Sequence, residues 1–438
     1  MSNFNITFIY PNFSHYRAKD ALETLVFAIL KSLTPPEIKT VLYDDRLEEI
    51  PFEEPTNLVA MSVDTFCAKR AYLIAKKYRD KGIPVVMGGF HPSLNSQEVL
   101  NFADAIVIGS AEPIWQELIE DAKKGQLKRI YQASQDTFSN GVIPDRSIFS
   151  GKRYAKLHVV QFSRGCRFQC DFCSIHVFYK HTLRYRPVDE VVREIKSLPG
   201  RTVYFADDNI FTNAEKTCEL VDALIPLKIR WACQISIDII EHPGLLKRMK
   251  ESGLFCVTVG FESLNQNNLK QIMKGWNTKY GSYEMAIKKI REQGIMTFGT
   301  FVFGYDDDTG EAFNQVLEFA IKNKLFLAHF NPLTPTPGTA LYERLFKEGR
   351  LIKDPWWLNP EYKYGEATFR PLHITPEELE KGCFSSRMKF NSWRNIVKRL
   401  IDFKANSTNL FNTFIFLLAN IITKHEVVKK QGVHLGEK

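Results

Sequence analysis

Three cysteines stand close together after a short apolar run. They are Cys166, Cys170 and Cys173, spaced C-x3-C-x2-C directly after residues 157–162. An iron–sulfur cube normally takes one thiolate on each iron from four cysteines, so three cysteines on one loop leave one iron open for an outside ligand. Gly165 lets the backbone turn where a side chain would collide. The spacing therefore predicts a [4Fe-4S] cluster with one open iron.

Two other interpretations of these cysteines are a structural zinc site and unrelated buried thiols. Zinc prefers four closed ligands, and the nearby fourth candidate is His176. A zinc clip would indicate a non-catalytic binding protein. The remaining cysteines lack paired spacing and are expected to be ordinary thiols, namely Cys67, Cys218, Cys233, Cys256 and Cys383.

The cysteine loop, with the aromatic Phe172 before its third cysteine, resembles the signature of the radical S-adenosylmethionine (SAM) enzymes. The resemblance implies that the open iron binds the amine and carboxylate of SAM, with Phe172 part of the cofactor site. It also implies that an electron splits SAM to a 5'-deoxyadenosyl radical, which abstracts hydrogen. An external donor such as a flavodoxin or ferredoxin would supply that electron.

Strand-like and helix-like segments alternate six times across residues 157–340, the region that must position this loop. Six parallel units with right-handed crossovers would form a curved, incomplete barrel, and the resemblance implies the same partial (β/α)6 fold. Chemistry in such barrels lies at the carboxyl ends of the strands. The predicted strands are 157–162, 202–205, 229–235, 255–259, 296–303 and 327–333.

Polar side chains at three of these strand ends are candidate SAM contacts. Asp207 resembles the family's contact to the methionine amine, although its neighbours Asp208 and Asn209 could equally cap the next segment. Gln234 resembles a ribose or carboxylate contact. Family pattern supports Glu262 as the acceptor of ribose hydroxyl protons, and a buried Glu262 would need a ligand or cation beside it.

Residues 1–130 also alternate short β-branched runs with helical patterns, which predicts a doubly wound parallel sheet of the flavodoxin type. Ligands of such sheets bind outside the carboxyl ends of the strands. Small or turn residues stand at these ends, which suggests a large flat ligand close to the backbone. Their order resembles the cobalamin-binding domain that precedes the barrel in one radical SAM subclass.

That resemblance makes six residues of the first domain candidate cobalamin contacts. The Asp-x-His-x-x-Gly motif that supplies a lower axial histidine in many cobalamin proteins is absent, as is common in this subclass. A domain that has lost its ligand and serves as a scaffold is the alternative. The candidate contacts are Ser62, Thr65, Gly88, Gly89, His91 and Glu112.

The rest of the chain comprises a polar, turn-rich linker at 131–156 and a mainly helical region at 341–438. Residues 381–438 contain eleven Lys or Arg and three Asp or Glu, a surplus equal to the whole net charge of +8. No nucleic-acid-binding module accompanies this charge. The apolar run 410–422 is too short to cross a bilayer, but apolar helices with basic flanks suit either peripheral membrane contact or a lid on the barrel.

The clustered cysteines and the absence of an N-terminal signal predict a cytoplasmic α/β protein, which could also associate with a membrane. Three hypotheses for its function follow. The first is a cobalamin-dependent radical SAM methyltransferase acting on an unactivated carbon of a small or lipid-like substrate. The second is a radical SAM cyclase, dehydratase or rearranging enzyme with a vestigial or non-methylating cobalamin domain. The third is the metal-clipped binding protein.

Overall fold

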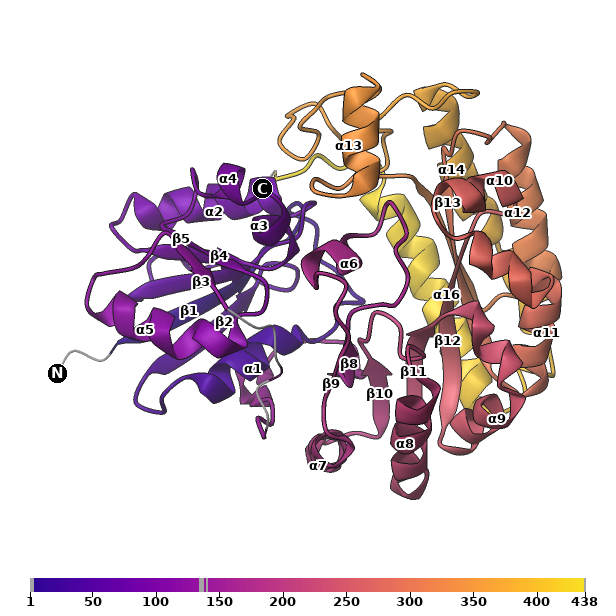
Figure 1. Cartoon of the computed structure of the whole chain (residues 1–438), viewed down its shortest axis with the longest axis horizontal. Helices are drawn as coiled ribbons and strands as arrows, with labels where there is room; N and C mark the ends of the chain where they lie inside the picture. Colours follow the sequence, from indigo (N-terminus) through magenta and orange to yellow (C-terminus); the bar gives the residue numbers. More distant parts are fainter. Residues whose placement is uncertain (1–3, 134–137, 139–140, 437–438) are drawn as a thin grey trace.

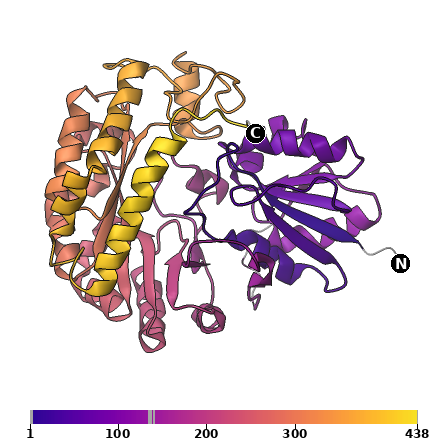
Figure 2. The ribbon, with the colours of Figure 1, turned by 180° about the vertical axis from the view of Figure 1, so that it is seen from behind.

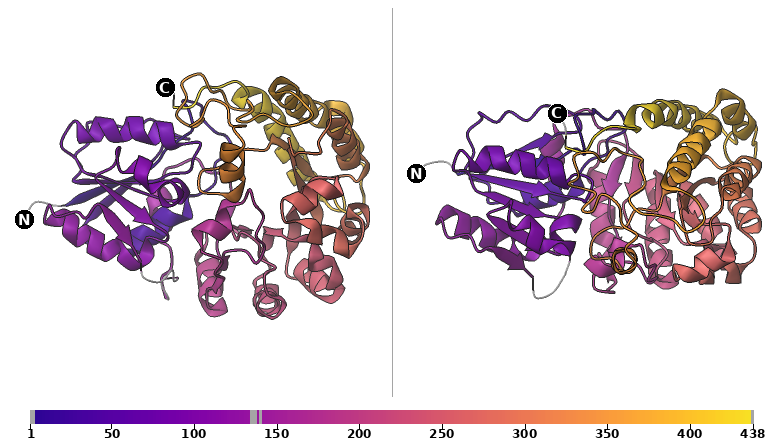
Figure 3. Two further views of the ribbon diagram at one scale, coloured as in Figure 1. Left: turned by 45° about the horizontal axis from the view of Figure 1, so that its top comes forward. Right: turned by 90° about the horizontal axis from the view of Figure 1, so that it is seen from above.

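Two α/β bodies lie side by side in the computed structural model, which describes residues 4–133, 138 and 141–436 (Figure 1). Residues 134–137, 139 and 140 of the predicted linker lie outside the described part. The chain passes from the first body into the second and returns to the first at its C-terminal end (Figure 3). There the amide of Gly436 donates a hydrogen bond to the carbonyl of Phe13, at 2.8 Å.

The first body is built on a six-stranded parallel sheet with strand order β2-β1-β3-β4-β5-β6. The prediction of a doubly wound sheet is therefore confirmed. The order reverses between β1 and β3, which is the position where such sheets bind ligands. Strand β6 pairs with β5 and continues past residue 130, so the predicted domain boundary cuts through a strand. The strands are β1 (Asn5–Tyr10), β2 (Lys39–Asp44), β3 (Leu58–Ser62), β4 (Val85–Gly88), β5 (Ala105–Ile108) and β6 (Ile130–Gln132).

Helices cover both faces of this sheet because its central strands, such as β3 and β4, are apolar on both sides. Helix α1 (Leu25–Leu33) and helix α5 (Trp115–Lys123) cover one face, where Phe27 and Trp115 pack on Phe8 at ring distances of 5.2 and 5.7 Å. Helix α2 covers the opposite face. The remaining helical segments here are α2 (Ala68–Arg79), α3 (Phe90–Leu94), α4 (Ser96–Val99), η1 (Glu112–Ile114) and η2 (Arg146–Phe149).

The second body contains six parallel strands in the order β14-β13-β12-β11-β10-β7. All six strands predicted from the sequence are present, so the partial barrel is confirmed. A two-stranded antiparallel hairpin, β8 (Ser163–Arg164) with β9 (Arg184–Tyr185), frames the cysteine loop. The barrel strands are β7 (His158–Val160), β10 (Thr202–Phe205), β11 (Arg230–Ile235), β12 (Leu254–Glu262), β13 (Met296–Phe303) and β14 (Leu327–Pro332).

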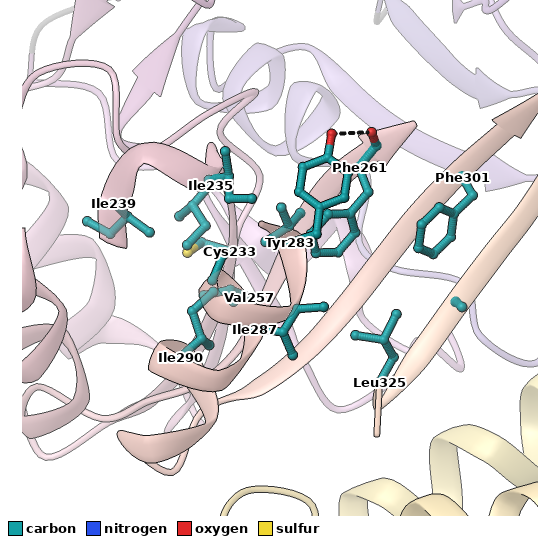
Figure 4. Close-up of a cluster of buried hydrophobic side chains, with 14 of the residues drawn as sticks. Cys233, Ile235, Ile239, Val257, Phe261, Tyr283, Ile287, Ile290, Phe301 and Leu325 are labelled. Atoms are coloured by element: carbon teal, nitrogen blue, oxygen red, sulfur yellow. Dashed lines mark hydrogen bonds between the residues drawn. The ribbon is translucent and has the colours of Figure 1, made fainter. Parts of the chain in front are cut away.

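The outer face of the barrel sheet is covered by the helices that connect its strands. Figure 4 shows Cys233 and Val257 on this face, with Ile287 and Ile290 of α11 among the same buried side chains. The helical segments of this body are α6 (Ser174–Phe178), α7 (Val188–Ser197), α8 (Ala214–Leu224), η3 (Ile225–Leu227), η4 (Ile237–Glu241), α9 (Pro243–Glu251), α10 (Gln266–Gln271), η5 (Gly275–Tyr280), α11 (Tyr283–Glu292) and α12 (Glu311–Lys322).

The C-terminal helix covers the part of the inner face of the barrel sheet that lies near the starts of the strands, seen from behind in Figure 2. Ala232, Cys256 and Met296 form a buried cluster with Phe416 of this helix. The apolar run at 410–422 is thus the first half of a longer helix that docks on the barrel. The C-terminal region contains α13 (Ala340–Lys347), α14 (Pro376–Phe390), α15 (Trp393–Leu400) and α16 (Leu410–Lys430). Among the described residues, no helix is long and apolar enough to cross a membrane.

Candidate functional site

The cysteine loop connects β8 to α6 at the carboxyl end of the barrel sheet. Gly165 has a φ of +89°, and a Cβ there would lie 2.2 Å from the carbonyl oxygen of Thr182, so only glycine fits this turn. Asp208 accepts a hydrogen bond from the Gly165 amide at 2.9 Å. The local sequence therefore fixes the loop just before Cys166, the first predicted cluster ligand.

The three thiols of the loop fit an iron–sulfur cube better than a single metal ion. Burial, with a smaller contribution from the neighbouring thiols, raises the pKa of Cys170 to about 11 and that of Cys173 to about 12. Within the described ranges, no three His, Cys, Asp or Glu side chains converge as one ion requires. A cube needs no such convergence, because each thiolate binds a different iron. Cys166, Cys170 and Cys173 could therefore hold the cluster.

A buried lysine that the sequence analysis did not identify lies beside the cysteines. The Nζ of Lys274 is 2.8 Å from Oε1 of Glu262, and both side chains are about nine-tenths buried. Burial lowers the pKa of Lys274, but the negative charges of Glu262 and Cys170 outweigh it and raise the pKa overall. The expectation that a buried Glu262 needs a cation is met by Lys274, which stands twelve residues further along the chain.

Asn209 and the aromatic side chains complete the surroundings of the loop. The Nδ2 of Asn209 lies 4.0 Å from the sulfur of Cys166 and donates to Ser236 at 3.0 Å. Phe172 is half-buried against the barrel core, and Phe168 stacks on Trp276 at 3.6 Å. Phe172 therefore supports the loop, and the structure gives no further role for it.

Asp207 is not placed to contact a ligand directly. Its side chain is fully buried and accepts hydrogen bonds from the Phe162 amide, at 3.1 Å, and from the amide and hydroxyl of Ser163. Asp207 thus ties β10 to the start of the cysteine loop, and the prediction of a direct contact to an amine is wrong. Asp208 is only half-buried and faces the loop, so it is the better candidate of the three polar residues.

Gln234 and Cys233 lie on opposite faces of β11, because alternate residues of a strand point in opposite directions. The side chain of Gln234 is exposed on the concave face of the barrel, and its contact to SAM stays a prediction. Cys233 is completely buried in the core outside the barrel (Figure 4). Cys233 therefore behaves as an ordinary interior thiol.

The first domain contributes a cavity of about 250 Å³ at the carboxyl edge of its sheet. Ser62, Gly88, Gly89 and Glu112, four of the predicted contacts, line it. Gly89 has a φ of +103°, and a Cβ there would lie 2.9 Å from the carbonyl oxygen of Val63. The cavity continues to the barrel through Gln161, Arg164 and Ala206, and its apolar wall is formed by α1. The small residues therefore leave space where the two domains meet.

Thr65 and His91 are not part of this cavity. His91 is completely buried, with its Nε2 3.0 Å from the hydroxyl of Tyr72 and 3.1 Å from Glu98. Its Nδ1 is 3.3 Å from the hydroxyl of Thr65, which lines a separate interdomain pocket of about 620 Å³ with Tyr16. The expectation that His91 lies at the ligand rim is wrong, because its ring holds α2, α3 and α4 together.

An ion pair joins the cavity to the cysteine loop. Arg164, two residues before Cys166, binds Glu112 and also donates to the hydroxyl of Ser110 at 3.2 Å. Both charged side chains are more than nine-tenths buried. No local pattern in the sequence marks Arg164, because its partner lies 52 residues away along the chain. The pair holds the first domain against the barrel next to the cluster ligands.

Comparison with known proteins agrees with this arrangement. Residues 160–320 match the model of the radical SAM superfamily, and this part of the chain is a radical SAM domain. The match spans the cysteine loop and the first five barrel strands apart from two residues of β7.

Two similar proteins come from Chlorobaculum tepidum. Bacteriochlorophyllide d C-12(1)-methyltransferase is 29% identical over 355 residues, which are 78% of this chain and 76% of that protein. Bacteriochlorophyllide d C-8(2)-methyltransferase is 26% identical over 414 residues, 90% of both chains. Among solved structures, the radical SAM methyltransferase TsrM of Kitasatospora setae, with cobalamin and a [4Fe-4S] cluster bound, has a TM-score of 0.62 at 17% identity. It covers 87% of this chain and 82% of its own, so the two-domain fold is shared.

Proposed function

We propose that this chain is a cobalamin-dependent radical SAM methyltransferase acting on an unactivated carbon. One observation carries the proposal: the cysteine loop and the cavity of the first domain meet at one place, held by the ion pair of Arg164 with Glu112. The two Chlorobaculum tepidum relatives are named methyltransferases, and the structure of TsrM contains both a cluster and cobalamin. A radical and a methyl donor must both reach the substrate, so the cluster site and the cobalamin site must lie next to each other.

Each part of the site has a distinct role in this proposal. Cys166, Cys170 and Cys173 hold the cluster, and the cavity lined by Gly88 and Gly89 receives cobalamin. When bound, these cofactors and SAM supply a hydrogen-abstracting radical and a methyl group. The protein orients them: Lys274 keeps Glu262 in place beside SAM, and Gln234 faces the barrel interior. Asp207 fixes the loop that carries the cysteines.

The test is anaerobic reconstitution with iron, sulfide and hydroxocobalamin, followed by analysis of the products formed from SAM. The proposal expects one bound corrin, the absorbance of a [4Fe-4S] cluster, and both 5'-deoxyadenosine and S-adenosylhomocysteine. Deoxyadenosine without S-adenosylhomocysteine would indicate instead the cyclase or rearrangement chemistry of the second hypothesis. Neither product in reduced, reconstituted protein would exclude both enzymatic hypotheses.

The proposal also includes a substrate class and partners. The two Chlorobaculum tepidum relatives are named for bacteriochlorophyllides. Their names support a bulky, mostly apolar compound, or a lipid-like one, as the substrate. A small electron carrier such as a flavodoxin or ferredoxin would reduce the cluster. Peripheral contact with a membrane would suit an apolar substrate, and the C-terminal region, with most of the chain's positive charge, is its candidate site.

A further inference from the structure

One side of α15 and α16 presents a row of large apolar side chains to solvent. On α15 and its C-cap residue they recur every fourth residue, and on α16 every three or four, so each set shares one face of its helix. Phe403 lies in the loop between the two helices. Phe403 is 79% exposed, Phe414 is 62% exposed and Leu410 is 91% exposed. This C-terminal apolar face consists of Trp393, Val397, Ile401, Phe403, Leu410, Phe414, Leu417, Leu418 and Ile421.

The two helices lie side by side, and hydrogen bonds fix them to the barrel. The exposure of this face therefore does not come from loose packing of the helices. Arg399 is completely buried and donates to the carbonyls of Leu325 and Phe326, at 3.0 and 2.8 Å, and to Oδ1 of Asn420 at 2.8 Å. Near the other end of the pair, Lys424 lies 5.6 Å from the ring of Trp393. The opposite side of α16 therefore packs against the barrel, and the apolar face points to solvent.

The charged side chains that the segment 391–425 itself exposes have one sign. Arg394 and Lys398 are exposed on α15, between the apolar residues, and Lys404 follows in the loop, 3.7 Å from Glu292. Asp402 is the one acidic residue in 391–425, and it is buried in an ion pair with Arg291 at 2.6 Å. Within this segment, exposed positive charges therefore have no exposed negative counterpart.

We propose that the C-terminal apolar face binds the interface of a membrane that contains anionic lipids. An apolar face flanked by Lys and Arg enters the boundary between headgroups and acyl chains, and its basic residues are attracted to anionic headgroups. The charge favours a lipid surface over an apolar partner protein or a second copy of this chain, which would bring like charges together. The inference does not depend on methyl transfer.

Vesicle flotation of the full chain tests the proposal. The protein is expected to float with vesicles of phosphatidylcholine and phosphatidylglycerol, to float less at high salt, and to stay behind with phosphatidylcholine alone. The double variant Phe403→Ser/Phe414→Ser should lower the partition constant at least about tenfold, since two large apolar groups no longer enter the interface. Arg394→Glu/Lys398→Glu should remove the preference for phosphatidylglycerol.

The matched control is Phe346→Ser, which removes a similarly exposed phenylalanine, 60% exposed, from α13 outside this face. It should float like the unmodified protein. Equal thermal unfolding of all variants would establish that they fold. Failure to float with anionic vesicles, or equal flotation of Phe403→Ser/Phe414→Ser, would overturn the proposal. Light scattering that shows a dimer, abolished by the same variant, would assign the face to a second copy instead.

Discussion

The Nζ of Lys274 lies 2.8 Å from Oε1 of Glu262 in the buried wall beside Cys170. Glu262 has a φ of +63°, a conformation that a non-glycine residue rarely adopts. The ion pair holds this carboxylate at the end of β12, and Lys274 places a positive charge next to the cluster ligands. This positive charge reduces the electrostatic repulsion between the thiolates and carboxylates around it.

Lys274→Met is predicted to destabilise the apoprotein by about 3–5 kcal/mol, because it leaves Glu262 buried without its partner. Urea unfolding measures this change. The exposed neighbour Lys270 gives the control variant Lys270→Met, which should unfold like the unmodified protein. The double variant Lys274→Met/Glu262→Gln should recover part of the loss. Equal unfolding of Lys274→Met and Lys270→Met would contradict a stabilising role.

Cys170→Ala is predicted to abolish assembly of the [4Fe-4S] cluster, since two remaining thiolates cannot hold a cube on this loop. Iron and sulfide content after anaerobic reconstitution, together with visible absorbance, measures the loss. The control is Cys218→Ala, a half-buried thiol on α8 outside the loop, which should retain full iron content. A cluster that persists in Cys170→Ala would show that the ligand assignment is wrong.

Gly89→Ala is predicted to weaken cobalamin binding and to lower stability by at least about 1 kcal/mol, because alanine is strained at positive φ. Its Cβ would also lie 2.9 Å from the carbonyl oxygen of Val63, so the β3–α2 turn must shift. Gly310→Ala is the control, since Gly310 has an ordinary φ of −57°, an added Cβ would meet no atom within 4 Å, and the residue lies outside the cavity. Titration with hydroxocobalamin and thermal unfolding measure both effects. Equal behaviour of the two variants would contradict this account of the turn.

The stability of the apoprotein is predicted to fall as the pH rises from about 4 to about 7. Burial raises the pKa of Asp207 to about 7 from its ordinary 3.8, although three hydrogen bonds oppose the shift. The folded state therefore binds a proton more tightly than the unfolded chain. The stabilisation from this proton is complete below the unfolded pKa and is lost as the pH rises through the folded one. Burial raises the pKa of Asp208 and of Asp171 to about 6, in the same direction.

Urea unfolding of the apoprotein between pH 5 and about 8 checks this dependence. Asp207→Asn removes the titrating group and should flatten the curve. Relative to the unmodified protein, the variant should be least stable at low pH, where the unmodified protein keeps the proton bound at Asp207. An unchanged pH dependence in Asp207→Asn would mean that other groups cause it.

The sequence alone was enough to predict the fold class and to place the three candidate cluster ligands on one loop. Strands can be predicted from short apolar runs because such runs depend only on neighbouring residues in the sequence. All six barrel strands lie where these runs predict them. Three cysteines within eight residues must lie on one loop whatever the rest of the chain does. Gly88 and Gly89 line a cavity as expected, because the backbone conformation of a sharp turn is also a local property.

Contacts between distant segments were decided only by the tertiary structure. Asp207 and His91 are polar residues that follow strands, where ligands are expected to bind. In the structure, both instead make buried hydrogen bonds within the protein. Arg164 and Lys274 carry no local signal, and their roles arise from the partners that packing brings to them. The apolar run of α16 could have been a lid or a membrane contact. The sequence specifies how apolar a helix is, but which side is buried depends on what the rest of the chain places against it.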